Sequence, residues 1–472
     1  MERRKASLSD KRKREWTITG LFGAFVFLQF TVLGLANHAG EGYLSAPQRD
    51  RIYYALQVFV ILGYLLYSLF FRFCTGRRFR SAAAAFVFGG FLVCGILMFA
   101  LGRDSLLYVL VSMAAALCLG SLGGAVHRRM SMETLADTPV ARCMGLGSAL
   151  AVVLQYLLQI RNGVVPLLPL FMLAAFALLL FLLHSLPGVA AEGAGKPEKT
   201  PPIRLVLSVL ITAVFILFTG FYNEYIHHLQ IQSNYQPYNV YSWPRLMLVP
   251  VYLLFAVIGD RKNGRLVPLA SVCIMLLALL NVVLTGSAGA YWLNMCLFYC
   301  AIAAFTSYYL LVFWRLAPGT GHPAFWGPMG RILDSLMVLL AGAVHLSALP
   351  APVVLGADIL GAALVILMMA VGGDFNLSAP GAAEKPAGSE AALLFSPEET
   401  LERMRGRYDL TPRETEVLRE LVLTEDKQTA ISQRLSIRVK TLQDYVTRLY
   451  RKTGAATRAG LTDLYHENRQ QR

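Results

Sequence analysis

Polar side chains recur along one face of a predicted helix near the C-terminal end of the chain. They are Lys440, Gln443, Asp444, Thr447, Arg448 and Arg451. Lysine and arginine suit phosphate groups, while glutamine and threonine can hydrogen-bond to base edges in the major groove of DNA. A solvated helix of any protein can carry the same residues, so the pattern alone leaves a nucleic-acid contact and a plain exposed surface equally open.

Three short helices are predicted to hold this polar face in place. Thr411, Pro412 and Glu414 supply an N-cap, a proline at the first helical position and a carboxylate in the first turn. Apolar residues then recur at helical spacing in three successive stretches: Val417, Leu418, Leu421 and Val422; Ala430, Ile431 and Leu435; Leu442, Tyr445, Val446 and Leu449. The third helix covers about 438–452 and ends at Gly454, and a last helix covers about 456–466. This order predicts a helix-turn-helix.

A set of positions in the same segment forms a specific signature. The positions are Leu410-Thr411-Pro412-Arg413-Glu414, Glu416-Val417-Leu418, Ile431, Leu435, Val439-Lys440-Thr441-Leu442, Leu449-Tyr450, Lys452 and Gly454. With them the segment resembles the LuxR-type helix-turn-helix of bacterial transcription regulators. The resemblance implies that Gln443, Asp444 and Thr447 read bases, and that Lys440 and Thr441 hold phosphates. It also implies double-stranded DNA as a partner and a homodimer formed through the last helix.

Four positions depart from the usual pattern of that family. Thr424-Glu425-Asp426 replaces a turn glycine, Ser432 an alanine, Arg438 a capping serine, and Tyr445 a histidine. We therefore predict the fold and make no prediction of the operator sequence.

The rest of the chain is far more apolar. Of its 472 residues, 56% are hydrophobic and 15% are charged, against roughly 25% charged residues in soluble domains. About twelve apolar stretches of roughly 20 residues predict an all-α, polytopic membrane domain. The predicted spans begin near Trp16, Ile52, Ala82, Ser105, Val140, Pro166, Ile203, Trp243, Leu266, Ala290, Arg331 and Pro352.

Basic residues are distributed unevenly over the predicted loops. With the N-terminus inside, the inside loops hold Arg72, Arg77, Arg78, Arg80, Arg128, Arg129, Arg142, Lys196, Lys199, Arg204, Arg261, Lys262, Arg265 and Arg315. The outside loops hold only Arg49, Arg51, Arg103, Arg161 and Arg245. This asymmetry and the even span count predict a bacterial inner-membrane protein with both termini in the cytoplasm.

Two loops suggest how the spans are grouped. A Pro/Gly-rich segment over 186–202 divides the spans six and six, and Gly259-Asp260-Arg261-Lys262-Asn263-Gly264-Arg265 precedes the ninth span. The second loop is similar to the signature of the major facilitator superfamily, in which an aspartate and several arginines tie helices together at the cytoplasmic face. The resemblance implies two six-helix halves, 16–186 and 203–371, with a central cavity between them.

Polar residues inside the spans are candidates for binding a small molecule, because they are costly in a bilayer. The candidate ligand-binding residues are Glu224, Tyr225, His345, Asp358 and Gln155. For single Gln or Asn residues a hydrogen bond between helices is the favoured alternative, and Arg331 with Asp334 is expected to form a structural ion pair. His227-His228 lacks the further ligands of a metal site. We expect no catalytic residue, no cofactor and no metal.

The remaining segments complete the predicted organisation. Residues 1–15 form a basic cytoplasmic arm, 16–371 the transmembrane sensor domain, 372–395 a flexible linker and 396–472 the DNA-binding domain. Together they predict a membrane-anchored, one-component regulator that senses a small molecule. Two alternatives stay open. One is a facilitator-like transporter with an appended regulatory DNA-binding module. The other is an anchor for which another protein senses the signal.

Overall fold

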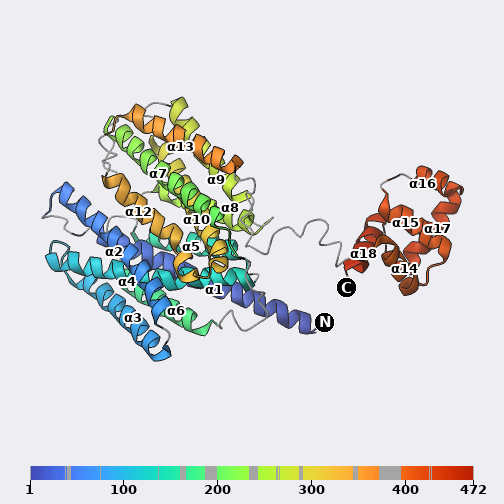
Figure 1. Cartoon of the computed structure of the whole chain (residues 1–472), viewed down its shortest axis with the longest axis horizontal. Coiled ribbons are helices and arrows are strands. Elements are labelled where there is room, and N and C mark those ends of the chain that lie inside the picture. The colour runs from blue at the N-terminus through green and yellow to red at the C-terminus, as the bar shows by residue number, and fades with distance from the viewer. Residues whose placement is uncertain are drawn as a thin grey trace. The chain divides into compact units, whose positions relative to one another are not determined.

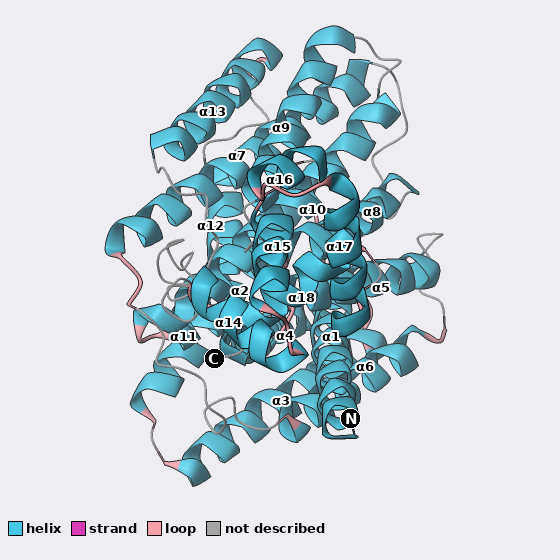
Figure 2. Cartoon of the chain, turned by 90° about the vertical axis from the view of Figure 1, so that its right-hand side faces the viewer, coloured by secondary structure: helices cyan, strands magenta, loops and turns pink. Residues whose placement is uncertain are grey.

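The computed structural model describes residues 2–37, 39, 44–74, 76–136, 138–159, 166–186, 199–232, 243–261, 264, 266–285, 291–343, 349–371, 395–424, 426, 428–455 and 457–470. Over these residues the regular elements are helices, without a strand (Figure 2). The chain divides into two compact units, Met1–Gly381 and Ala382–Arg472. Each unit has a hydrophobic core of its own.

The first half of the membrane unit is built from helices α1 to α6 (Figure 1). Their bounds are α1 (Glu2–Ala36), α2 (Ala46–Phe73), α3 (Arg77–Ala100), α4 (Leu106–Glu133), η1 (Thr134–Ala136), α5 (Val140–Gln159) and α6 (Leu168–Ser185). Helix α1 packs against α4, α5 and α6, and α4 also packs against α2 and α3.

The second half continues from α7 to α13. Its elements are α7 (Pro202–Gln232), η3 (Trp243–Met247), α8 (Leu248–Gly259), α9 (Leu266–Thr285), α10 (Tyr291–Leu316), η6 (Ala317–Thr320), α11 (Pro323–Trp326), α12 (Met329–Ala343) and α13 (Ala351–Val371). The halves meet where α5 packs against α8 and α2 against α12. Gly145 permits the first of these contacts, because a Cβ there would collide with the Tyr252 carbonyl oxygen and the Ala256 side chain.

Each predicted span coincides with a helix of the described chain. Eight helices there are long and apolar enough to cross a membrane, and shorter apolar helices cover Trp243–Gly259, Leu266–Asn281 and Leu355–Met368. The all-α, polytopic fold class is thus confirmed. Helix α7 extends beyond the roughly 20 residues of its predicted span and continues to Gln232, so that its last turns include Glu224.

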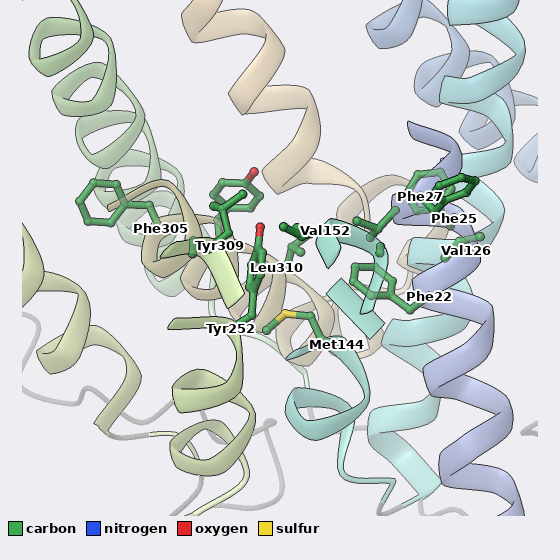
Figure 3. Packing of buried hydrophobic residues seen from close by; sticks show 14 of the residues in the cluster. Phe22, Phe25, Phe27, Val126, Met144, Val152, Tyr252, Phe305, Tyr309 and Leu310 are labelled. Atoms are coloured by element: carbon green, nitrogen blue, oxygen red, sulfur yellow. The ribbon is translucent and has the colours of Figure 1, made fainter. Parts of the chain in front are cut away.

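The two halves share one core. Figure 3 shows Phe22 of α1 and Val126 of α4 on one side, and Tyr252 and Tyr309 of the second half on the other. Nearby, the Trp314 indole donates a hydrogen bond of 3.1 Å to Nδ1 of His127, so that α10 and α4 are joined inside an aromatic cluster.

The second unit is a bundle of five short helices. They are α14 (Pro397–Tyr408), α15 (Pro412–Leu423), α16 (Gln428–Arg434), α17 (Val439–Thr453) and α18 (Arg458–Gln470). The predicted cap of α15 is present as a capping box, in which the Thr411 amide donates to the Glu414 carboxylate at 2.8 Å. Gly454 ends α17 with a φ of +77°, as predicted. The last helix is longer than expected and reaches Gln470.

Candidate functional sites

Helix α17 turns its polar residues outward. Leu442, Val446 and Leu449 are buried against the rest of the small unit. The predicted DNA contacts are all exposed, namely Lys440, Thr441, Gln443, Asp444, Thr447, Arg448 and Arg451. A single helix face thus presents cations together with amide and hydroxyl groups, as major-groove recognition requires.

Two cations of this face, Lys440 and Arg451, form no ion pair within the described part of the small unit, while Arg448 lies over the Tyr445 ring. There, ion pairs occupy Arg405, Arg413, Arg419, Arg434 and Lys452. Neither Lys440 nor Arg451 takes part in one. Their charges are therefore available to phosphate groups.

Arg458 of α18 holds the turn that leads into α16. Its guanidinium donates to the carbonyl oxygens of Leu421 at 2.9 Å and of Asp426 at 2.6 Å, and to that of Thr424. This turn carries Thr424-Glu425-Asp426 in place of a glycine. One side chain thus holds three backbone carbonyls between α15 and α16, and sequence analysis missed this role of Arg458.

Glu414 links the start of α15 to the end of α17. Lys452 Nζ lies 2.8 Å from the Glu414 carboxylate and donates equally closely to the Asp409 carbonyl. Burial raises the pKa of Glu414, but the hydrogen bonds from Lys452 and Thr411 lower it by more, so the pKa in the folded unit lies below its ordinary value.

This lowered pKa predicts an acid-sensitive step in stability. The Glu414 carboxylate stabilises the folded unit above its ordinary pKa of about 4.3, and the stabilisation disappears as the pH falls through the lowered value. Between about pH 5 and pH 3, the unfolding free energy should fall more steeply for the wild type than for Glu414→Gln. Denaturant titrations at several pH values measure both slopes. Glu402→Gln, at an exposed position of α14, is the control and should keep the wild-type slope. Equal slopes for Glu414→Gln and the wild type would contradict the prediction.

In the membrane unit, Arg331 of α12 lies in a polar cluster between the halves. Its guanidinium donates to the Tyr309 hydroxyl at 2.8 Å and pairs with Asp334 at 2.8 Å. With its amide oxygen turned toward the guanidinium, Gln29 of α1 also accepts from Arg331. The expected pair of Arg331 and Asp334 is therefore present, and it also joins α12 to α1 and α10.

Other polar side chains form hydrogen bonds between helices, as the favoured alternative predicted. Ser335 donates to Gln57 at 2.9 Å, which joins α12 to α2. Asn294 of α10 accepts from Tyr222 of α7 and from Asn281 of α9, each at 2.9 Å. These residues stabilise the packing of the bundle.

Charged groups also join the helices at the end of the bundle where α5 begins. Glu133 is fully buried and contacts Arg14 at 2.8 Å and Arg129 at 2.6 Å. Asp260 accepts from the backbone amides of Ala141 and Arg142, at 3.1 and 2.8 Å, and so caps the first turn of α5 from the other half. The aspartate of the facilitator-type loop thus ties helices together, as predicted.

Comparison with known proteins assigns the small unit. Residues 409–465 match the family model described as "Bacterial regulatory proteins, luxR family". These residues are a LuxR-family domain. Helix α17 with its exposed polar face therefore belongs to a LuxR-family domain, and α14 is an additional helix that precedes the matched region. No curated protein matches the chain.

Solved structures match the membrane unit in fold. A bacterial homologue of the iron transporter ferroportin in an outward-facing state with soaked iron is 14% identical, with a TM-score of 0.54 over 76% of this chain and 99% of its own. The same homologue without soaked iron gives a TM-score of 0.51 over the same shares at 14% identity. The human organic anion transporter MFSD10 is 16% identical over 77% of this chain and 99% of its own, with a TM-score of 0.47. The membrane unit has a major-facilitator-like fold, and neither this fold nor the LuxR family is an enzyme class.

Of the five predicted ligand residues, the structure describes the side chains of two, Gln155 of α5 and Asp358 of α13, and these two helices pack against different neighbours. Gln155 of α5 is 1% exposed, and its two amide atoms have no hydrogen-bond partner. Asp358 is 2% exposed with Oδ1 unpartnered, but its helix α13 packs against α7 and α9, away from α5. Glu224 and Tyr225 lie on α7 with side chains outside the described residues, as is all of His345. Among the described residues, no group of His, Cys, Asp and Glu could hold a metal ion.

Sequence analysis predicted the ion pair of Arg331 with Asp334 but not the contacts of Arg331 with Gln29 and Tyr309. The residues of this cluster come from α1, α10 and α12, which are far apart along the chain. The sequence did contain a signal, since one span holds both an arginine and an aspartate while other spans hold glutamines. Polar groups inside a bilayer need hydrogen-bond or ion-pair partners, so such residues are expected to contact one another. Which glutamine meets the arginine depends on packing.

Proposed function

We propose that this protein is a membrane-anchored, one-component transcriptional regulator. It binds double-stranded DNA through α17 as a homodimer, and its facilitator-like unit senses a small molecule. The observation that carries the proposal is the exposed polar face of α17 on a LuxR-family domain, in one chain with a facilitator-like fold. The uneven basic loops favour the bacterial inner membrane with both termini in the cytoplasm, where DNA is accessible.

The signal would act by population shift. A ligand that binds one arrangement of the two halves more tightly raises the population of that arrangement. The contacts of Asp260 with α5, and of Arg331 with α1, are made across the halves and must change if the halves move. Such a change would then alter whether two LuxR-family domains can pair on an operator.

The experiment that tests the proposal uses both halves of the chain. The tail from Ser396 to Arg472 should shift DNA from its own promoter region at low salt. The full-length protein, tagged at its N-terminus in its native membrane, should occupy a few sharp genomic sites. Failure of the tail to bind any such DNA would reject the DNA-binding part of the proposal.

The fold itself favours a second candidate, a facilitator-like transporter with a regulatory DNA-binding module. Structures with this fold include a homologue of an iron transporter. Vesicles separate the two functions, because a sensor shows saturable binding without accumulation, whereas a transporter accumulates its substrate.

Substitutions on α17 should separate base reading from phosphate binding. Gln443→Ala or Asp444→Ala should change operator preference, with about 1–3 kcal/mol lost at the base pair that is contacted. Lys440→Ala should weaken binding to all sequences and lower the salt-dependence slope by about 1. Operator selection and salt titrations of the purified tail measure both effects, with Glu402→Gln as control. An unchanged operator profile in the first two variants would show that α17 is misassigned.

A further inference from the structure

We propose that Arg438, the residue immediately before α17, binds a guanine in the major groove and so determines part of the operator sequence. The inference rests on the proposed function and adds a specificity residue to it. In the sequence, Arg438 stood out only as a departure from the capping serine of the LuxR family, and it was not among the predicted DNA contacts.

Helix α17 begins differently from α14 and α15. Ser396 and Thr411 start those two helices with capping boxes, in which the hydroxyl accepts from a backbone amide of the first turn. Arg438 holds the same position before α17 with an extended backbone, but its side chain makes no capping hydrogen bond. An arginine side chain has no acceptor atom and therefore cannot cap the helix.

The charge of Arg438 is also unfavourable at this position. The start of a helix carries the positive end of the helix dipole, so a cation there lowers the stability of the helix. Arg438 thus costs the domain both a cap and a favourable charge interaction. Departures of this kind from the local rules of folding concentrate at functional sites, where a contact outside the fold offsets the loss.

The Arg438 guanidinium is available to a partner outside the domain. Arg438 is exposed, and the Val439 side chain beside it is 37% exposed, so the start of α17 is not covered by the described part of the small unit. None of the ion pairs in that part includes Arg438. The carboxylates that form those pairs have other cations as partners, namely Glu398, Glu402, Glu414, Glu416, Glu420 and Asp426.

The position of Arg438 suits a contact with a base. It precedes Thr441, a predicted DNA contact, by three residues, which places the two on neighbouring parts of the helix surface. In helix-turn-helix domains the N-terminal residues of the recognition helix contact base edges. The planar fork of arginine matches O6 and N7 of guanine with two hydrogen bonds, and this is the commonest specific contact in the major groove.

The test uses the purified tail, Ser396 to Arg472, and its Arg438→Ala variant. Operators selected by the wild-type tail should contain a guanine that the variant does not select. Exchange of this guanine for adenine should weaken wild-type binding about tenfold or more and leave binding of the variant almost unchanged. A deazaguanine that lacks N7 should reproduce the loss, whereas inosine keeps N7 and O6 and should not.

Two further variants separate the roles of charge, shape and stability. Arg438→Lys keeps the charge without the planar fork, so it should retain the salt dependence of binding and lose the guanine preference. Arg438→Ser restores a cap and should raise the Tm of the tail by about 4 °C while it loses the same preference. A purely structural role cannot give a more stable domain with lower selectivity. Arg405→Ala removes an exposed arginine of α14 and should leave the operator preference unchanged.

The outcomes distinguish this inference from the proposed function. A wild-type tail that binds no DNA would reject the proposed function and the inference with it. If the tail binds a defined operator and Arg438→Ala keeps the same preference at every position, only the inference fails. A uniform loss of affinity for all sequences in Arg438→Ala, with a lower salt slope, would assign the side chain to a phosphate and would also overturn the guanine contact.

Discussion

Arg458→Ala should lower the unfolding free energy of the LuxR-family domain by about 3 kcal/mol. At temperatures near the melting temperature of the variant domain, DNA binding should be lost. The guanidinium holds the carbonyls of Leu421, Thr424 and Asp426, and alanine leaves these acceptors without their partner. Hydrogen bonds to a charged group contribute about 1.5–3 kcal/mol each, and three on one side chain are not additive. Urea unfolding of the tail, with its separate core, measures the loss.

Two further variants make this result specific. Arg458→Lys should recover only part of the stability, because a single ammonium cannot reproduce the planar fork. Arg405→Ala removes an arginine whose side chain is 40% exposed and whose ion pair is with the exposed Glu402, so it should change stability by less than about 0.5 kcal/mol. A similar small loss for Arg458→Ala would mean that the turn before α16 keeps its shape without this contact.

Glu133→Gln should destabilise the membrane unit by about 3 kcal/mol. The Glu133 carboxylate is fully buried between Arg14 and Arg129, and it also accepts from Thr138 at 2.9 Å. Removing one partner of a buried ion pair leaves the other charges uncompensated, which typically costs about 3–5 kcal/mol. The lower figure applies because Arg14 is partly exposed and water can solvate it. Thermal unfolding of the full-length protein in detergent measures the effect.

The matched control for this variant is a second carboxylate that pairs with an arginine at the same end of the bundle. Glu15→Gln also neutralises a carboxylate near the first turn of α5, but its contact with Arg142 is 3.7 Å long and both side chains are partly exposed. Its expected cost is below about 1 kcal/mol. If both variants lowered the melting temperature equally, burial of Glu133 would not be the cause.

Local signals in the sequence determined much of the small unit. Thr411, Glu414 and Gly454 were predicted to begin α15 and end α17, and the structure confirms each one. Such caps depend on the backbone groups of a single turn, which leave the same donors and acceptors unsatisfied in any helix. The face of α17 was predictable for a similar reason, since the 3.6-residue period separates buried Leu442 and Leu449 from exposed Gln443 and Arg451.

Hydropathy determined the helices of the membrane unit, because backbone groups in a bilayer must be satisfied within each segment. It did not determine their partners. Asp260 caps α5 from a position 118 residues away, and Arg331 meets Gln29 from the opposite half of the bundle. Gln155 was a candidate from the sequence, yet its lack of a partner is visible only after the bundle is packed. Side-chain pairing across helices depends on crossing points such as Gly145 against Tyr252, and tertiary structure alone fixes these.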